Sequence, residues 1–287
     1  MIIISIHIFP FEIDRLERLL MYLNDCFLYV DLNKTEILLH VTLNKNENLL
    51  KSLSSNDDKF IELMKKVKCE TFYEIKNDNK LLGVNDHRRK TIQISEQDDQ
   101  IIFLDSDLFF NEKILAHQIK SIDFLKKKHE FYIISPNTIR LWDKTWDILT
   151  HELYINHSFS FHKKANFYNI VNQNYGMISL QKINKFKWGG GWFNCISANL
   201  LKSIGIPKSF KGYGLDDTFV MECCKLIKKE KGDVSQYILK NMIVCEDIRI
   251  DTKKYFKENA PNFKEFCNKR FKHELSSFLI SYKKETI

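Results

Sequence analysis

The sequence predicts an α/β fold built on a parallel sheet of the nucleotide-binding kind. A strand is expected over 2–8, an amphipathic helix over 12–23 and a second strand over 36–43, and this order favours parallel pairing. A further strand over 101–104 is apolar at every position, as in strands that are buried on both faces. With 287 residues, of which 44% are hydrophobic, the chain is long enough for one large domain.

The remaining elements follow from hydrophobic periodicity and from helix-breaking residues. Pro136 is expected to end a short strand, and Gly205 with Pro207 is expected to close a helix. The basic and aromatic tail is expected to be a solvated helical appendage. The predicted elements are helices over 57–68, 112–128, 197–204, 219–229 and 253–284, a helix-like stretch that begins at 83–90, and strands over 131–135 and 242–244.

Charge and cysteine content narrow the function classes. A formal net charge of +7 favours an anionic partner, such as a nucleotide diphosphate, a lipid phosphate or an anionic membrane. Nucleic acid is not expected, because the sequence has no zinc-finger spacing, RNA-recognition signature or concentrated basic helix. Seven scattered cysteines, and a short apolar start without a basic leader, predict a cytoplasmic location.

Two aspartates, Asp105 and Asp107, follow the buried strand at 101–104. Ligands bind at the carboxyl ends of strands in open α/β sheets, and carboxylates are hard ligands for a divalent cation that also holds phosphates. The alternative is a polar turn or an Asx cap. In either case the turn is expected to lie outside the core.

Six of the nine glycines lie between Gly189 and Gly214, so this region has unusual backbone requirements. The run Gly189-Gly190-Gly191 lets the backbone approach a ligand closely, and Trp192 with Phe193 would then form a wall of a sugar pocket. A tight turn packed beneath a core tryptophan is the alternative.

A second acidic motif, Gly212-Tyr213-Gly214-Leu215-Asp216-Asp217, precedes a predicted helix. Acidic side chains are stabilised at a helix N-terminus, which is a purely structural explanation of Asp216 and Asp217. The chemical alternative is that one of these carboxylates accepts a proton from an attacking hydroxyl.

These three motifs, in this order, resemble those of the GT-A-fold glycosyltransferases, especially the inverting family-2 and beta-1,4-galactosyltransferase-like enzymes, over roughly residues 1–250. The resemblance implies a Rossmann-like, mixed, mostly parallel sheet flanked by helices. It divides the chain into a nucleotide-binding half over 1–110, an acceptor-binding half over 111–250 and a helical extension over 251–287. The implied activity is metal-dependent, inverting transfer of a sugar from a UDP-sugar to a growing glycan, such as a surface polysaccharide or a lipid-linked glycan.

The resemblance also implies roles for individual residues. Asp217 matches the catalytic base, and Asp216 matches a residue that holds the acceptor. Asp105 and Asp107 match ligands of Mn²⁺ or Mg²⁺, and Glu246 or Asp247 replaces the histidine that relatives place after a late strand. The residues expected to bind the nucleotide sugar are Arg88, Arg89, Asp105, Ser106, Gly190, Gly191 and Trp192.

Several alternatives stay open at this point. Arg88 and Arg89 suit a diphosphate or a uracil edge, but they also fit a solvated basic helix start. Trp142 and Trp146 would share a helix face, as core residues or as a sugar platform. Contact with an anionic membrane is the alternative for the solvated tail. For the whole chain, the other candidates are a haloacid-dehalogenase-like phosphatase and a non-catalytic glycan-binding relative.

Overall fold

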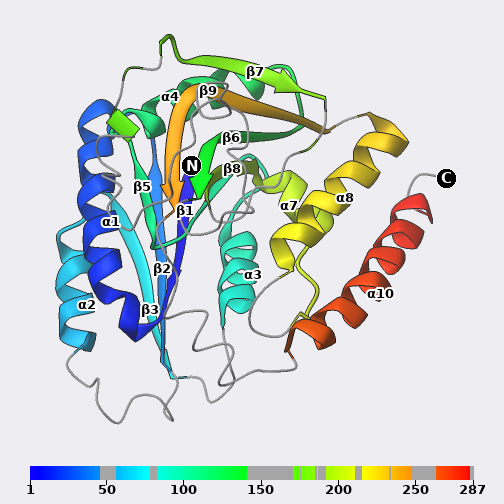
Figure 1. Ribbon diagram of the computed structural model, residues 1–287, viewed down its shortest axis with the longest axis horizontal. Helices are drawn as coiled ribbons and strands as arrows, with labels where there is room; N and C mark the ends of the chain where they lie inside the picture. The colour runs from blue at the N-terminus through cyan, green and yellow to red at the C-terminus, as the bar shows by residue number, and fades with distance from the viewer. Residues whose placement is uncertain are drawn as a thin grey trace.

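The computed structural model describes residues 1–45, 56–77, 83–140, 171–172, 174, 176–184, 186, 192–210, 215–232, 234–246 and 263–284. Within these residues, nine strands form one sheet in the order β3-β2-β1-β4-β8-β6-β9-β5, with β7 paired on β9 (Figure 1). The strands are β1 (Ile2–Ile8), β2 (Ile37–Lys45), β3 (Glu70–Asn77), β4 (Gln100–Leu104), β5 (Leu108–Phe110), β6 (Phe131–Arg140), β7 (Ser179–Ile183), β8 (Trp192–Ser197) and β9 (Val234–Glu246).

Helices cover both faces of this sheet (Figure 1). They are α1 (Ile13–Cys26), α2 (Asn56–Lys65), α3 (Val84–Ile94), α4 (Ile114–Leu125), α7 (Ala198–Ile204), α8 (Asp216–Lys231) and α10 (Phe263–Lys284), with 3-10 turns η1 (Pro10–Glu12) and η2 (Phe27–Tyr29).

The sheet is mixed, and its long pairings are mostly parallel. Strands β3, β2, β1 and β4 are parallel to one another, and β6 is parallel to β9. The antiparallel strand β8 joins the two groups, so the carboxyl ends of β1, β4 and β9 lie at one edge. The α/β prediction is therefore confirmed, and the arrangement is consistent with a GT-A-like fold.

Period-2 alternation along the strands divides the core in two. In β1, the even-numbered isoleucines pack in a cluster with α1, α2 and α4, whereas Ile3 packs in a second cluster with α7 and α8. In β4, Ile102 and Leu104 join the first cluster, and Ile101 and Phe103 join the second. The odd-numbered residues of β4, Ile101 and Phe103, therefore lie on the face of the sheet that α3 and α8 cover.

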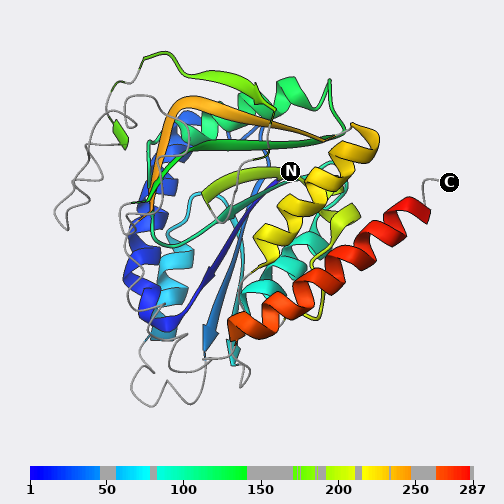
Figure 2. The same cartoon turned by 45° about the vertical axis from the view of Figure 1, so that its right-hand side comes forward.

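The C-terminal helix α10 is confirmed as a helix, but it is not simply solvated. It lies beside α8 in both views (Figure 2). Phe271, Leu275, Phe278 and Tyr282 pack on the second core cluster, and the rings of Phe271 and Phe219 are 6.2 Å apart. No helix in the described ranges has the length and apolar character needed to cross a bilayer.

Two predicted strands are present, but their extents differ from the prediction. The strand that was expected to end before Pro136 continues to Arg140, because the pairing of β6 with β9 shifts register between Pro136 and Asn137 and so accommodates the missing N–H. The late strand predicted over 242–244 is part of β9, which is longer than predicted and begins at Val234. The edge strand β3 was missed because its side chains are mostly half-buried or exposed, which weakens the hydrophobic pattern.

Candidate active site

Three carboxylates meet where β4, β5 and β9 come together. One oxygen from each of Asp105, Asp107 and Glu246 lies within 4.8 Å of the others. The chain turns at 105–107 from β4 into β5, and β5 pairs antiparallel with β9 so that Leu108 lies opposite Glu246. The last residue of β9 is thereby brought beside the aspartate turn, 139 positions away from Asp107 in sequence.

The burial of this cluster corrects one expectation. Asp107 is fully buried and Glu246 is 2% exposed, whereas Asp105 is half-buried, so the turn does not lie outside the core. Like charges held this close repel one another, and a divalent cation with hard-oxygen preference offsets that repulsion. The residues present therefore fit Mn²⁺ or Mg²⁺ on the chemistry of the donor set.

Ser106, between the two aspartates, anchors the turn. Its hydroxyl donates to Oε1 of the buried Glu12 at 3.2 Å, and the Phe9 N–H donates to Oε2 of the same carboxylate at 3.0 Å. Glu12 thus holds both the end of β1 and the turn after β4. The Ser106 hydroxyl is thus hydrogen-bonded to another residue of the protein. Its contact with a nucleotide sugar stays a prediction.

Arg88, from α3, connects this cluster to the second acidic motif. Its Nη1 donates to Asp216 Oδ2 at 2.5 Å, and its Nη2 lies 3.5 Å from Asp105 Oδ1. The guanidinium carbon also lies 5.0 Å from the centre of the Phe103 ring. Burial disfavours the charge, but Asp216, Asp105 and Asp217 outweigh it and raise the pKa of Arg88 above its ordinary value.

The two aspartates of the second motif begin α8, which follows Leu215 in a left-handed conformation with φ 67°. Asp216 is 3% exposed, and Asp217 Oδ1 accepts a 2.6 Å hydrogen bond from the Thr218 N–H. Asp216 accepts the hydrogen bond of Arg88, whereas the donors described for Asp217 are the N–H and the hydroxyl of Thr218.

The environment of Asp217 makes it a base suited to neutral pH. Asp217 is half-buried, and its desolvation together with the charge of Asp216 raises its pKa from 3.8 to about 7, although Arg88 and the Thr218 N–H lower it and Asp105 raises it further. A carboxylate with a pKa near neutrality is ionised often enough to accept a proton and basic enough to hold it.

Arg89 points elsewhere. Its Nη1 donates to the Pro207 carbonyl at 2.9 Å, and its Nη2 donates to Asp86 at 2.6 Å. These partners lie on the loop after α7 and on the exposed side of α3. The two adjacent arginines of the sequence prediction therefore separate, and the structure brings only Arg88 to the carboxylates.

Other predicted site residues are described in part or not at all. Gly190, Gly191, Asp247, Trp142 and Trp146 lie outside the described residues. Trp192 begins β8, and only its backbone is described.

The prediction for Phe193 as a pocket wall is wrong. The residue has φ 60° and is fully buried, with its ring 4.8 Å from that of Phe110. Its carbonyl accepts a 2.6 Å hydrogen bond from the Gln118 side chain. Phe193 is therefore a core residue.

Sequence reasoning missed a polar layer between the sheet and α3. Ser5 and His7 on β1, and His40, Thr42 and Asn44 on β2, alternate with apolar residues that face the first core cluster. That alternation is visible in the sequence and is unusual for parallel strands, whose two faces are normally both apolar. It was a signal that one face of this sheet carries polar contacts.

Comparison with solved structures gives one match to report. The crystal structure of GalNAc-T7 with UDP, GalNAc and Mn²⁺ matches with a TM-score of 0.48 and 11% sequence identity over 96% of this chain. The match covers 54% of the GalNAc-T7 chain, so this protein spans about half the length of that structure. No family model and no curated protein matches the sequence. The chemistry of the site therefore rests on its own residues.

Proposed function

We propose that this protein is a metal-dependent glycosyltransferase that moves a sugar from a nucleotide-diphosphate sugar, UDP-linked, to a hydroxyl of a glycan acceptor with inversion. The observation that carries the proposal is the position of Asp217. Asp217 is a carboxylate with a pKa of about 7. Two side chains, Asp216 and Arg88, connect it to the cluster of three carboxylates.

Asp105, Asp107 and Glu246 would hold the divalent cation, Mn²⁺ or Mg²⁺. When bound, such a cation neutralises the charge that develops on the leaving diphosphate. These carboxylates come from the turn after β4 and from the end of β9, at the strand ends where ligands bind in open α/β sheets.

Asp217 would take the proton of the acceptor hydroxyl as its oxygen attacks the anomeric carbon. The bond from that carbon to the diphosphate oxygen breaks in the same step, so a single in-line displacement inverts the configuration. Asp216, fixed by Arg88, would orient the acceptor. The donor and acceptor sides of the reaction are thus joined by one guanidinium.

The test is UDP release from a panel of UDP-sugars, measured with acceptor glycans and with Mn²⁺, Mg²⁺ or a chelator. We expect metal-dependent release, and a β-linked product by NMR from an α-linked donor. An α-linked product would overturn inversion. Hydrolysis of a generic aryl phosphate without UDP release would instead favour the phosphatase, and tight glycan binding without turnover would favour the non-catalytic relative.

A further inference from the structure

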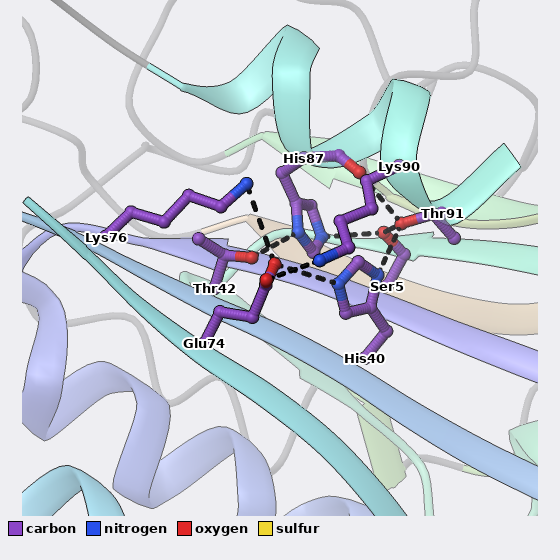
Figure 3. A network of polar contacts seen from close by, with 8 residues as sticks. All are labelled: Ser5, His40, Thr42, Glu74, Lys76, His87, Lys90 and Thr91. Atoms are coloured by element: carbon purple, nitrogen blue, oxygen red, sulfur yellow. Dashed lines mark hydrogen bonds and ion pairs between the residues drawn. The ribbon is translucent and has the colours of Figure 1, made fainter. Parts of the chain in front are cut away.

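The polar layer beneath α3 is buried as deeply as the apolar core. Ser5 is 3% exposed, His87 is 1% exposed, and His40, Thr42 and Thr91 are fully buried. Figure 3 shows these side chains, from β1, β2 and α3, turned toward one another between the helix and the sheet. Burying polar groups costs free energy unless they form hydrogen bonds, and a buried network of hydrogen bonds fixes the positions of its members.

The direction of the hydrogen bonds in this layer follows from Thr91, if its single hydroxyl proton is donated to the His87 carbonyl. Thr91 Oγ1 donates to the His87 carbonyl at 3.1 Å, because a carbonyl only accepts. Thr91 Oγ1 must then accept from the Ser5 hydroxyl and from His40 Nδ1, each at 2.8 Å. Ser5, having donated, accepts from His87 Nε2 at 2.8 Å, so His87 Nδ1 is left to accept from the Thr42 hydroxyl at 2.8 Å. The chain of donors therefore assigns the Nε2–H tautomer to a neutral His87.

The surroundings of His87 also favour its neutral form. Burial, followed by the neighbouring His40 and His7, lowers the pKa of His87 well below its ordinary value, and the charges of Arg88 and Lys76 act in the same direction. These groups face the imidazole from β2, β1, α3 and β3. A neutral ring keeps one donor and one acceptor, which is what the two hydroxyls require.

The outer edge of the layer is closed by ion pairs. Glu74 on β3 pairs with Lys90 of α3, and Lys76 lies 3.6 Å from the same carboxylate (Figure 3). The helix α3 is thus attached to three neighbouring strands by directional contacts. Apolar packing would hold the helix equally well against the sheet, but it would not define its rotation and translation so narrowly.

His87 directly precedes Arg88 on α3, and the two side chains point to different partners. The imidazole is held by Ser5 and Thr42, whereas the guanidinium reaches Asp105 and Asp216. A rotation of α3 about its axis would move both together. We propose that His87 is a positioning residue, which through Ser5 and Thr42 sets the rotation of α3 and so holds the Arg88 guanidinium between Asp105 and Asp216.

This inference rests on the proposed function only for its effect on turnover; its structural content is independent. The first measurement is therefore the tautomer, read from long-range ¹H–¹⁵N spectra of the full-length protein labelled at histidine, with His87→Gln to assign the signal. We expect the pattern of a neutral Nε2–H ring that does not titrate from about pH 6 to 8. An Nδ1–H ring, or a ring that gains a proton in that range, would overturn the proposal.

The second measurement is the water exchange of the Arg88 Nη protons, in Thr42→Val and in Ser5→Ala. Val has nearly the shape of Thr, so Thr42→Val removes the donor to His87 with little change in packing. Losing one buried hydrogen bond shifts a local opening equilibrium by about tenfold, so we expect exchange of the Arg88 protons to accelerate by about that factor. Thr42→Ser, which retains the hydroxyl, should restore the slow exchange.

Ser121→Ala is the matched control. Ser121 is a buried helical hydroxyl that donates to the His117 carbonyl at 2.7 Å in α4, as Thr91 does to His87 in α3. We expect no change in Arg88 exchange in this variant. Equal acceleration in the control, or none in both Thr42→Val and Ser5→Ala, would make the layer a general stabiliser of the fold and overturn the positioning role.

The last measurement is turnover in the same variants. We expect kcat to fall in Thr42→Val and to recover in Thr42→Ser, with the control unchanged. Altered Arg88 exchange with unaltered kcat would overturn the link to catalysis. If the wild-type protein releases no UDP from any donor, the proposed function fails, whereas the tautomer and exchange results still decide the positioning of Arg88.

Discussion

Arg88 Nη1 donates to Asp216 Oδ2 at 2.5 Å, across 128 positions of the chain. The same guanidinium lies 3.5 Å from Asp105 Oδ1, so one buried cation holds a carboxylate from each acidic motif. Desolvation and the charge of Asp216 raise the pKa of the neighbouring Asp217, whereas the charge of Arg88 lowers it. A carboxylate with a raised pKa suits acid–base chemistry at neutral pH.

Replacing Arg88 by Ala should destabilise the protein strongly. It removes the cation that pairs with the buried Asp216, and removing one member of a buried ion pair costs about 3–5 kcal/mol. Urea unfolding measures the loss. Lys225→Ala, which breaks the exposed pair with Glu222, is the control and should cost about 0–1 kcal/mol. Equal losses in the two variants would contradict the buried pairing.

The stability difference between Asp217→Asn and the wild type should depend on pH. The pKa of Asp217 is raised from 3.8 to about 7 in the folded protein. Between these values the unfolded chain loses a proton that the folded protein keeps, so wild-type stability falls as pH rises. Asn does not titrate. Asp217→Asn should therefore gain relative stability from about pH 4 to 7 and change no further above that range, as measured by unfolding free energies. A constant difference would mean that the pKa is not raised.

Asp217→Asn should lose turnover while donor binding stays nearly unchanged. Asn retains the size of the side chain but not its basicity, and a positioned base contributes about 10²–10⁴-fold. In the wild type, kcat/KM should fall as pH drops below about 7, since the carboxylate must be ionised. Full activity in Asp217→Asn together with an inactive Asp216→Asn would place the base one residue earlier.

Mn²⁺ should stabilise the wild type but not Glu246→Gln or Asp107→Asn. A ligand that binds only the folded state adds about 2.7 kcal/mol at a hundred times its dissociation constant. Thermal unfolding with and without Mn²⁺ measures this effect. Glu222→Gln, which changes a carboxylate on the surface of α8, should respond like the wild type. Undiminished stabilisation of Glu246→Gln would remove this residue from the metal site.

Much of the fold was readable in the sequence. The strand over Ile2–Ile8 and the helix that contains Leu16 and Leu20 were predicted because their apolar residues recur at the periods of a buried strand and an amphipathic helix. Asp105 and Asp107 were recognised because two carboxylates directly after an apolar strand contrast sharply with it. These are local patterns, which depend on a few neighbouring positions.

Elements that depend on partners were harder to predict. The strand through Pro136 continues only because β9 provides a register shift for it, and Phe193 is core only because Phe110 packs against its ring. Neither condition can be read from neighbouring residues. The same is true of Arg88 and Arg89, which are adjacent in sequence but point to different partners.

The α/β class, the positions of the two acidic motifs and the residue types able to bind a metal or accept a proton could all be predicted from the amino-acid sequence. The tertiary structure decided which of them meet: Glu246 beside Asp107, Arg88 between Asp105 and Asp216, and His87 between Ser5 and Thr42. The physical reason is that local periodicity sets which face of an element is apolar, whereas contacts between distant segments depend on strand order, register and helix rotation. Desolvation of the half-buried Asp217 and the charge of Asp216 then raise its pKa, which is a property of the assembled site.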